Sequence, residues 1–337
     1  MIAEYVSIAH PDRMADLLAA KLITYLQTSP DVHAAIEVLC VKKTVIFSGE
    51  SNAKVSRRLL KKVVKEVMKD CGYERRTNFG KDDFATAKDI KIANLINSQS
   101  EDIALSTTDK KDKSGWNDQG IFFASYDETT PTGQNITKFL AQSFGDYLFD
   151  YAFKNKDYGT DIKVLMESVD SFIQRVVVAI PTVKTTLVTN QEIKIAYMNW
   201  CREVKEKYDI TVNPDVSHFE VNTSGKYTKH GMIADTGITG RKIAVNCLDT
   251  NYKNGGGSMI KPWHSADLLV PLILRECANI EKKSLMGTTA IGTNFLTVYS
   301  DDDEIFDVMT IDLLSEANKY RLFDGKSYYK MVKRNFQ

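Results

Sequence analysis

The spacing of apolar residues along the first quarter of the chain predicts helices and strands in mixed order. After Pro11, apolar side chains recur every three or four residues as far as Tyr25, which is the spacing of one helix face. Residues 35–41 and 44–47 are apolar, β-branched runs separated by two lysines, which predicts a β-hairpin. Residues 55–68 then form a long amphipathic pattern whose polar face is rich in lysine and arginine. We interpret that basic face as a solvated surface and not as a nucleic-acid patch.

The rest of the chain continues this alternation. The pattern predicts a mobile charged loop at 106–114, strands at 118–126, 173–180 and 210–212, and a helix at 189–207. A sequence of the capping-box form, Thr-Asn-Gln-Glu, opens the predicted helix at Thr189. No glycine fingerprint of a dinucleotide-binding fold is present. The fold class predicted from this order is mixed α and β.

Composition narrows the class of protein. The chain has 337 residues, 43% of them hydrophobic, which is enough for two or three compact units. It carries 44 basic and 44 acidic residues, and this balance argues against a dedicated nucleic-acid binder. Its five cysteines form no C-x-x-C pair, as expected for reduced thiols. No signal peptide or membrane-spanning run is apparent, so we expect a cytoplasmic protein with no membrane partner.

The candidate chemistry begins with the segment from Asp235 to Lys242, which reads DTGITGRK. Glycines allow a backbone to approach a bulky ligand, and an arginine beside a lysine suits phosphate oxygens. Downstream come three consecutive glycines at 255–257, then Lys261 and Asp267. Carboxylates bracketing such a run are suitable ligands for Mg²⁺, which shares phosphate ligands and keeps some water. A glycine-rich turn flanked by charge is also common in ordinary loops, so this segment alone leaves both readings open.

Two further segments carry a family resemblance. The segment from Ser7 to Asp16 reads SIAHPDRMAD, and residues 117–120 read NDQG. Together with the segment at 235–242 they resemble, in the same order, three motifs of the S-adenosylmethionine synthetase (methionine adenosyltransferase) family. This chain resembles a divergent and somewhat short member. The resemblance implies an α+β fold of three similar, intertwined sheet-plus-helix units around a pseudo-threefold axis. We place these units at residues 1–105, 116–231 and 232–337.

The resemblance also implies an activity: ATP, L-methionine and water give S-adenosylmethionine, phosphate and diphosphate. The implied catalytic residues, which also bind ATP, are His10, Lys163, Arg241, Lys242 and Lys261, and Asp161 would hold the adenosine. The implied methionine ligands are Glu50, Gln99, Asp118 and Asp235. Asp12 and Asp267 would bind two Mg²⁺ ions, and Glu37 would bind K⁺. The family builds its site between two subunits, so we expect a homodimer with shared active sites, with a dimer of dimers as an open alternative.

Without the resemblance these residues have plainer interpretations. His10 would be a helix-capping or core residue, Glu37 and Glu50 surface acids, and Asp118 a turn residue. The chain also departs from the family pattern. Ser265 stands where a second phosphate-binding lysine is expected. Where the family has an apolar strand that packs on adenine, this chain has residues 219–222 followed by a basic insertion at 225–230. An alternative function is therefore a catalytically weakened paralogue that binds ATP or methionine as a regulatory partner.

Overall fold

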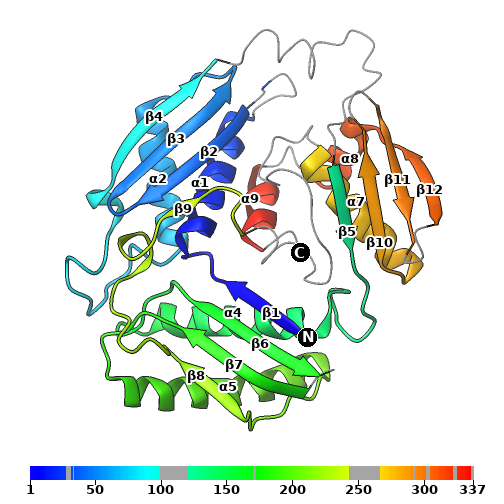
Figure 1. Ribbon diagram of the computed structural model, residues 1–337. Helices are drawn as coiled ribbons and strands as arrows, with labels where there is room; N and C mark the ends of the chain where they lie inside the picture. Colours follow the sequence, from blue (N-terminus) through cyan, green and yellow to red (C-terminus); the bar gives the residue numbers. More distant parts are fainter. Residues whose placement is uncertain are drawn as a thin grey trace.

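The computed structural model describes residues 1–27, 32, 34–98, 120–169, 172–242, 266–290, 293–300, 304–321 and 325–334. Its strands are β1 (Ile2–Val6), β2 (Ala34–Val41), β3 (Thr44–Ser51), β4 (Lys91–Asn97), β5 (Gly120–Ala124), β6 (Lys163–Val169), β7 (Phe172–Ala179), β8 (His218–Val221), β9 (Gly237–Ile238), β10 (Leu285–Thr289), β11 (Phe295–Tyr299) and β12 (Ile305–Thr310). Its helices are α1 (Pro11–Leu26), α2 (Arg57–Asp70), α4 (Ile136–Lys154), α5 (Thr186–Tyr208), α7 (Ala266–Glu281), α8 (Leu313–Lys319) and α9 (Gly325–Lys333). Within these ranges the strands form three four-stranded sheets, arranged as a triangle in Figure 1. The α+β class with three sheet-plus-helix units is confirmed.

The three sheets share one plan. Their strand orders are β4-β3-β2-β9, β8-β7-β6-β1 and β12-β11-β10-β5. In each sheet, three strands that follow one another in sequence pair with a single strand from elsewhere in the chain. That single strand is the first one of another unit, so the units exchange strands in a cycle. This exchange is the intertwining that the family resemblance implied, and it does not test the residue boundaries that we predicted for the units.

The third unit departs from the plan in its last strand. Strands β3 and β4 run parallel, as do β7 and β8, and a crossover helix (α2 or α5) joins each pair. Strands β11 and β12 run antiparallel and follow each other directly. The remaining helices, α8 and α9, come after the sheet and not within it. Helix α9 lies against α1 near the centre of the molecule (Figure 1).

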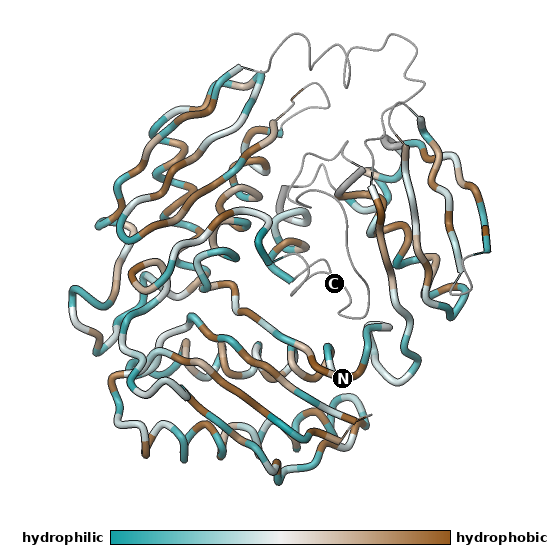
Figure 2. The backbone as a smooth tube through the Cα atoms, in the orientation of Figure 1, coloured by the Kyte–Doolittle hydropathy of each residue, from teal (hydrophilic) through white to brown (hydrophobic). Residues whose placement is uncertain are grey.

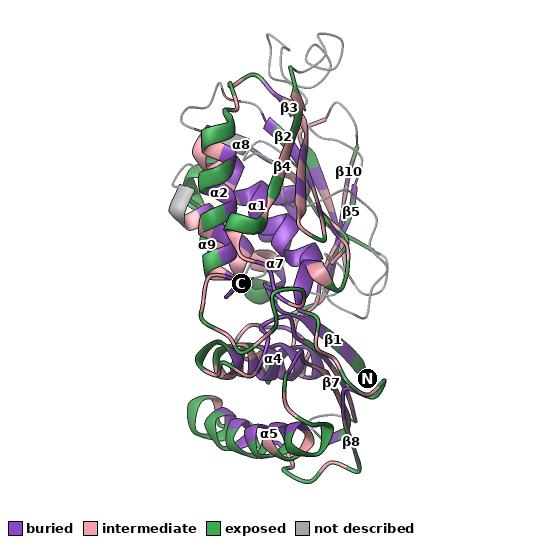
Figure 3. Cartoon of the chain, turned by 90° about the vertical axis from the view of Figure 1, so that its left-hand side faces the viewer, coloured by how far each residue is buried: buried purple, intermediate pink, exposed green. Residues whose placement is uncertain are grey.

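Helix α1 is buried almost all round, which is unusual for a helix in a two-layer unit. Its apolar residues pack beneath the first sheet, but three charged residues of its first two turns, Asp12, Arg13 and Asp16, are also at most 2% exposed. Figure 3 shows α1 as mostly buried, and Figure 2 shows hydrophobic stretches along the strands of all three sheets. Buried charges need partners. Their partners, described below, are what place α1 at the candidate site.

Most predicted elements are observed near their expected positions, and two details are wrong. Residues 210–212 form no strand, because the side-chain amide of Asn213 bonds both the N–H and the C=O of Ile173 at the sheet edge, at 2.8 and 2.9 Å. The helix predicted from Thr189 begins at Thr186, and Thr185 is its N-cap. The predicted cap residue Glu192 instead accepts hydrogen bonds from Tyr151 and Tyr158. Among the described helices, none is both long and apolar enough to cross a membrane.

Candidate active site

His10 is the N-cap of α1, and its imidazole is buried. Its Nδ1 accepts a hydrogen bond from the backbone N–H of Asp12 at 3.2 Å, so the neutral ring carries its proton on Nε2. Burial, together with the charges of Lys163 and Lys242, lowers the pKa of His10 to about 2. Nε2 is buried without a hydrogen-bond partner among the described residues, and it lies 3.7 Å from Oδ2 of Asp235. The ring is therefore a neutral N–H donor that is available to an acceptor on a ligand.

The segment from Asp235 to Lys242 is anchored to the first turns of α1 by two carboxylates. Asp12 Oδ1 accepts from the N–H of Ile238 at 2.8 Å, and Asp16 Oδ1 accepts from the N–H of Gly240 at 2.8 Å. The two acids are four residues apart and so share one helix face. Gly237 packs directly on the helix start, because a Cβ there would lie 2.0 Å from the carbonyl carbon of Pro11.

This anchoring places two cations beside His10. Lys242 Nζ lies 3.2 Å from Asp12 Oδ2, and a guanidinium nitrogen of Arg241 lies 3.8 Å from Asp12 Oδ1. The Arg241 side chain is 56% exposed, so its fork of donors remains accessible to an incoming anion. The helix N-terminus itself favours negative charge at this point. Together these groups form a site suited to a polyanion.

Asp161 and Lys163 reach the same site from the second unit. The side chain of Ser7 bonds the backbone of residues 160 and 162, so this strand start lies against the turn leading into His10. Asp161 is 1% exposed, and its Oδ2 accepts from the hydroxyl of Tyr227 at 3.1 Å. Burial raises the pKa of Asp161 to about 7, although the neighbouring charge of Lys163 opposes the shift. A buried carboxyl with such a pKa is a common feature of functional sites.

Two residues that the sequence reasoning missed, Tyr227 and His230, lie in the basic segment at 225–230. His230 is fully buried, and its Nε2 accepts from the N–H of Thr160 at 3.1 Å. Its ring packs against Tyr73 and Phe84, with centroids 4.5 and 4.6 Å away. The segment is therefore fastened beside Asp161. The sequence feature that could have indicated these two residues is the presence of a tyrosine and a histidine beside the lysines of this segment.

Comparison with known proteins identifies the family. Residues 1–101 match the family described as S-adenosylmethionine synthetase, N-terminal domain. S-adenosylmethionine synthases of Zymomonas mobilis and Granulibacter bethesdensis are 28% and 29% identical over 269 and 268 residues. These matches cover 76% of this chain and 66% and 65% of the relatives. Together these matches support a divergent member of the S-adenosylmethionine synthetase family.

A solved structure has the same fold. It is described as an unusual S-adenosylmethionine synthetase from Campylobacter jejuni, and it superposes with a TM-score of 0.80 at 20% identity. The match covers 99% of this chain and 93% of that one. At 20% identity, this similarity is evidence for a shared fold and not for a shared activity. It shows that this chain and the Campylobacter jejuni protein share one overall fold.

The chemistry of the site fits Mg²⁺ in one respect. Asp12 and Asp235 supply hard carboxylate oxygens on either side of His10, and the Asp235 side chain is 56% exposed. The described residues contain no cluster of three or more histidine, cysteine or acidic side chains that could hold a metal by themselves. Mg²⁺ is commonly held by one or two carboxylates plus substrate phosphates and water. The two acids therefore suit an ion that arrives with a polyphosphate.

The two predicted hairpin acids lie elsewhere on the first unit. Glu50 pairs with Ala35 across the hairpin, and Glu37 pairs with Ser48, so both carboxylates stand on one face of the sheet. That face is the open one, because the alternate residues of β2 are buried against α1. The structure thus brings Glu37 and Glu50 together, on the side of the sheet opposite α1.

Other predicted residues are not described. Gln99, Asp118, Lys261 and Ser265 lie outside the described residues, as does the predicted loop at 106–114. Asp267 belongs to the first turn of α7, but its side chain is not among those described. Their predicted roles stay predictions.

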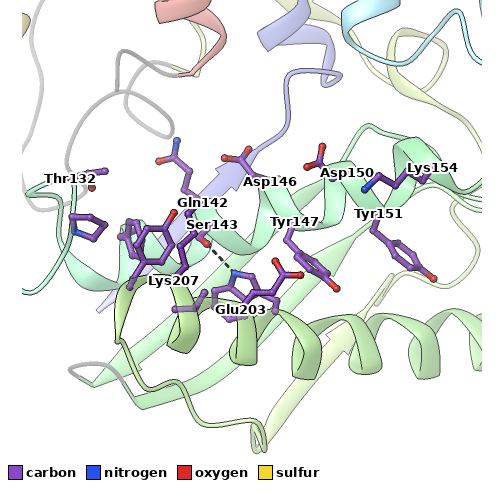
Figure 4. Close-up of a pocket in the computed structure, with 15 residues that line it drawn as sticks. Thr132, Gln142, Ser143, Asp146, Tyr147, Asp150, Tyr151, Lys154, Glu203 and Lys207 are labelled. Atoms are coloured by element: carbon purple, nitrogen blue, oxygen red, sulfur yellow. Dashed lines mark hydrogen bonds between the residues drawn. The ribbon is translucent and has the colours of Figure 1, made fainter.

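A cleft of about 570 Å³ lies between α4 and α5, away from the candidate site (Figure 4). Tyr147 and Tyr151 of α4 and Glu203 of α5 are among the residues that line it. None of the predicted site residues does. This cleft is therefore distinct from the charged cluster around His10.

Proposed function

We propose that this chain is a methionine adenosyltransferase that converts ATP, L-methionine and water to S-adenosylmethionine, phosphate and diphosphate. The observation that carries the proposal is the buried, neutral His10, whose unpartnered Nε2–H lies among Lys163, Arg241 and Lys242. A polyphosphate is the ligand best matched by several cations and a neutral donor at a helix N-terminus. Membership of the family supplies the class of reaction.

The proposed reaction requires stabilisation of the negative charge on the leaving group, and it requires no general base. The methionine sulfur carries no proton, so its attack on C5′ of the ribose needs no proton acceptor. The leaving group is tripolyphosphate, and its departing oxygen gains negative charge. A cation about 4 Å from one such charge is worth roughly 4 kcal/mol at an effective dielectric of 20. Several contacts of this kind, from Arg241, Lys242 and Lys163, could supply a barrier reduction of about 8 kcal/mol, the low end for enzymes.

His10 has a distinct task in this proposal. Because its pKa is about 2, the ring stays neutral through the physiological pH range. It therefore donates a hydrogen bond to a phosphate oxygen without changing its own charge. A neutral ring also forms no ion pair with the nearby carboxylates of Asp12 and Asp235, so its N–H stays available to the phosphate. Lys261, in this proposal, adds a further cation to the same phosphates, and cleavage of tripolyphosphate follows in the same site.

We propose Mg²⁺ and K⁺ as cofactors. Asp12 and Asp235, with Asp267, would hold Mg²⁺, which would neutralise phosphate charge. Glu37 would be the potassium ligand. One carboxylate at an open sheet face is an incomplete site, so its other ligands would come from elsewhere in the assembly.

We also propose that two copies pair through the open faces of their sheets. These faces carry exposed apolar residues, among them Leu95 (59%), Ile121 (43%) and Phe295 (48%). Extensive exposed apolar surface is typical of an interaction site. Glu37 and Glu50 stand on such a face, so pairing would bring them, and the proposed methionine ligands, toward a partner's site.

The direct test is incubation with ATP, L-methionine, Mg²⁺ and K⁺, followed by mass spectrometry for S-adenosylmethionine and separation of the phosphate products. We expect product from the wild type and a loss of at least about a hundredfold in Lys242→Met, which removes one of the phosphate cations. Lys229→Met, an exposed lysine of the 225–230 segment, is the control and should keep its activity. Binding of ATP or methionine without product would favour the regulatory paralogue instead.

A further inference from the structure

The C-terminal helix α9 is packed into the first unit. Tyr328, Tyr329 and Val332 are at most 7% exposed and belong to the same core as α1. The Tyr329 hydroxyl donates to Asp70, the last residue of α2, at 2.9 Å. Figures 1 and 3 both show α9 alongside α1. The end of the chain is thus part of the scaffold that supports the candidate site.

Arg13 connects α9 to α1 through a fully buried guanidinium group. The side chain is 1% exposed. One terminal nitrogen donates to the carbonyl oxygen of Val332 at 3.0 Å, and the other donates to Asp16 Oδ2 at 3.3 Å. The planar fork of an arginine can make two such bonds in fixed directions, which a lysine cannot. The guanidinium therefore sets the position of Asp16 relative to α9.

Asp16 in turn contacts the segment from Asp235 to Lys242, which we call the phosphate-binding segment. Its second oxygen accepts from the N–H of Gly240, the residue before Arg241. Burial raises the pKa of Asp16 to about 6, while Arg13 and the Gly240 N–H both lower it. An ionised carboxylate is the stronger acceptor, so the arginine also strengthens the bond to Gly240. A continuous series of hydrogen bonds runs from Val332 through Arg13 and Asp16 to Gly240, buried at the Arg13 end and partly buried at Gly240.

We propose that Arg13 is a positioning residue that couples the docking of α9 to the order of the phosphate-binding segment. By bridging Val332 to Asp16, it holds Gly240 so that Arg241 and Lys242 face the site. The assignment of the ligand as ATP rests on the proposed function, but the mechanical coupling does not. A ligand or partner that displaced α9 would, by the same contacts, loosen Arg241 and Lys242.

Hydrogen exchange tests the coupling without any assay of activity. In Arg13→Met, which keeps the apolar length but removes both donors, the amide of Gly240 should exchange at least about tenfold faster in the folded protein. Tyr329→Phe is the matched control, because it removes one hydrogen bond of α9 to α2 while the buried Tyr328 and Val332 keep α9 docked and the contacts of Arg13 stay intact. Its Gly240 exchange should stay at the wild-type rate. Arg13→Lys, which can reach one partner but not both, should lie between.

Kinetics supply the second readout. Arg13→Met should raise the KM for ATP about tenfold and leave the KM for methionine within about twofold, since Arg241 and Lys242 are the groups that move. Unchanged Gly240 exchange in folded Arg13→Met, or an equal rise in Tyr329→Phe, would overturn the proposal. If Arg13→Met does not fold, Asp16→Asn and Arg13→Lys decide by the same comparison. Altered exchange in a protein that makes no S-adenosylmethionine would leave the coupling standing and refute the proposed function.

Discussion

At the scale of single residues, Tyr227 connects the divergent segment at 225–230 to a predicted site residue. From the sequence we interpret residues 225–230 as a basic insertion after a diverged strand. The structure places the Tyr227 hydroxyl on Asp161, the residue expected to hold adenosine. A hydrogen bond to the ionised form favours that form. The tyrosine therefore helps to keep Asp161 charged near neutral pH despite its burial.

We predict that Tyr227→Phe shifts the pH dependence of ATP binding. Burial raises the pKa of Asp161 to about 7, and the tyrosine bond lowers it, so removing the hydroxyl should raise the pKa further. Asp161 of the variant would then be protonated at neutral pH. The affinity of the variant for ATP should therefore fall as the pH drops from about 8 to 7, a range in which the wild type should still bind ATP. Titrations of ATP binding across this range check the shift. Tyr151→Phe, whose hydroxyl bonds Glu192, is the control; matching profiles for the two variants would contradict the role of Tyr227.

We predict a steric limit at Gly237. A methyl group there would lie 2.0 Å from the carbonyl carbon of Pro11 and 2.5 Å from the N–H nitrogen of Asp12, both backbone atoms that cannot move aside cheaply. Gly237→Ala should lower the free energy of unfolding by about 1–3 kcal/mol and abolish most activity, because the segment must lift off α1. Denaturant unfolding and turnover measure both effects. Gly80→Ala, which meets only a side-chain oxygen at 3.3 Å, should be nearly silent, and an equal loss there would remove the steric explanation.

At the scale of elements, the start of α5 illustrates competition for one side chain. Glu192 lies three residues after Thr189, as a capping box requires, yet its carboxylate is used by Lys184, Tyr151 and Tyr158. Tyr151 and Tyr158 lie 41 and 34 residues away in sequence, and Lys184 lies eight residues away. The helix instead starts one turn earlier, where Thr185 accepts from the N–H of Val188.

We predict that this cluster stabilises the second unit in a pH-dependent way. The hydrogen bonds from Lys184, Tyr158 and Tyr151 lower the pKa of Glu192, although partial burial opposes them. A depressed carboxyl pKa stabilises the fold above the unfolded-state value near 4.3, and this stabilisation is lost as the pH falls through the folded-state pKa. Glu192→Gln should therefore cost about 1 kcal/mol at pH 7, after allowing for solvent screening, and progressively less below pH 4. Unfolding curves at pH 7 and below pH 4 measure the loss of stability, and the exposed Glu206→Gln is the control. A loss in free energy of unfolding for Glu192→Gln that is as large below pH 4 as at pH 7 would refute the prediction.

At the scale of the whole molecule, the exchange of strands makes the three units interdependent. Strand β1 completes the sheet of the second unit, and the turn that follows it carries His10 into α1. Strand β9 completes the first sheet and continues into Arg241 and Lys242. The candidate site therefore lies where exchanged strands cross between units. Loosening any one unit should disturb it.

We predict that the open sheet faces hold two copies together. Leu95 is 59% exposed on β4, and Leu95→Arg should shift the protein from dimer to monomer and lower its activity at least about tenfold. Leu187→Arg is the matched control, because Leu187 is 69% exposed on α5, which covers the other face of its sheet. Analytical ultracentrifugation at several concentrations measures the association. A wild type that sediments as a monomer at micromolar concentration would refute the prediction.

The sequence by itself determined the local elements and the family. Periodicity of apolar residues was enough for α1, the β2–β3 hairpin and α2, because each of these is stabilised by contacts within or beside itself. Motifs at residues 7–16, 117–120 and 235–242 were enough to indicate the family, because three such segments rarely occur in the family's order by chance. Three of the residues expected to carry the reaction, His10, Arg241 and Lys242, could be named from those motifs.

Only the tertiary structure decided which distant segments meet. The carboxylates of Asp12 and Asp16 bond backbone N–H groups that lie 226 and 224 residues further along the chain, and no pattern of local spacing encodes such a pairing. The cyclic exchange of β1, β5 and β9 is likewise invisible in sequence, because a short edge strand reads the same whichever sheet it joins. Burial of Arg13 between α1 and α9 depends on where the last helix packs. These are long-range contacts, and their free energy depends on the whole fold being formed.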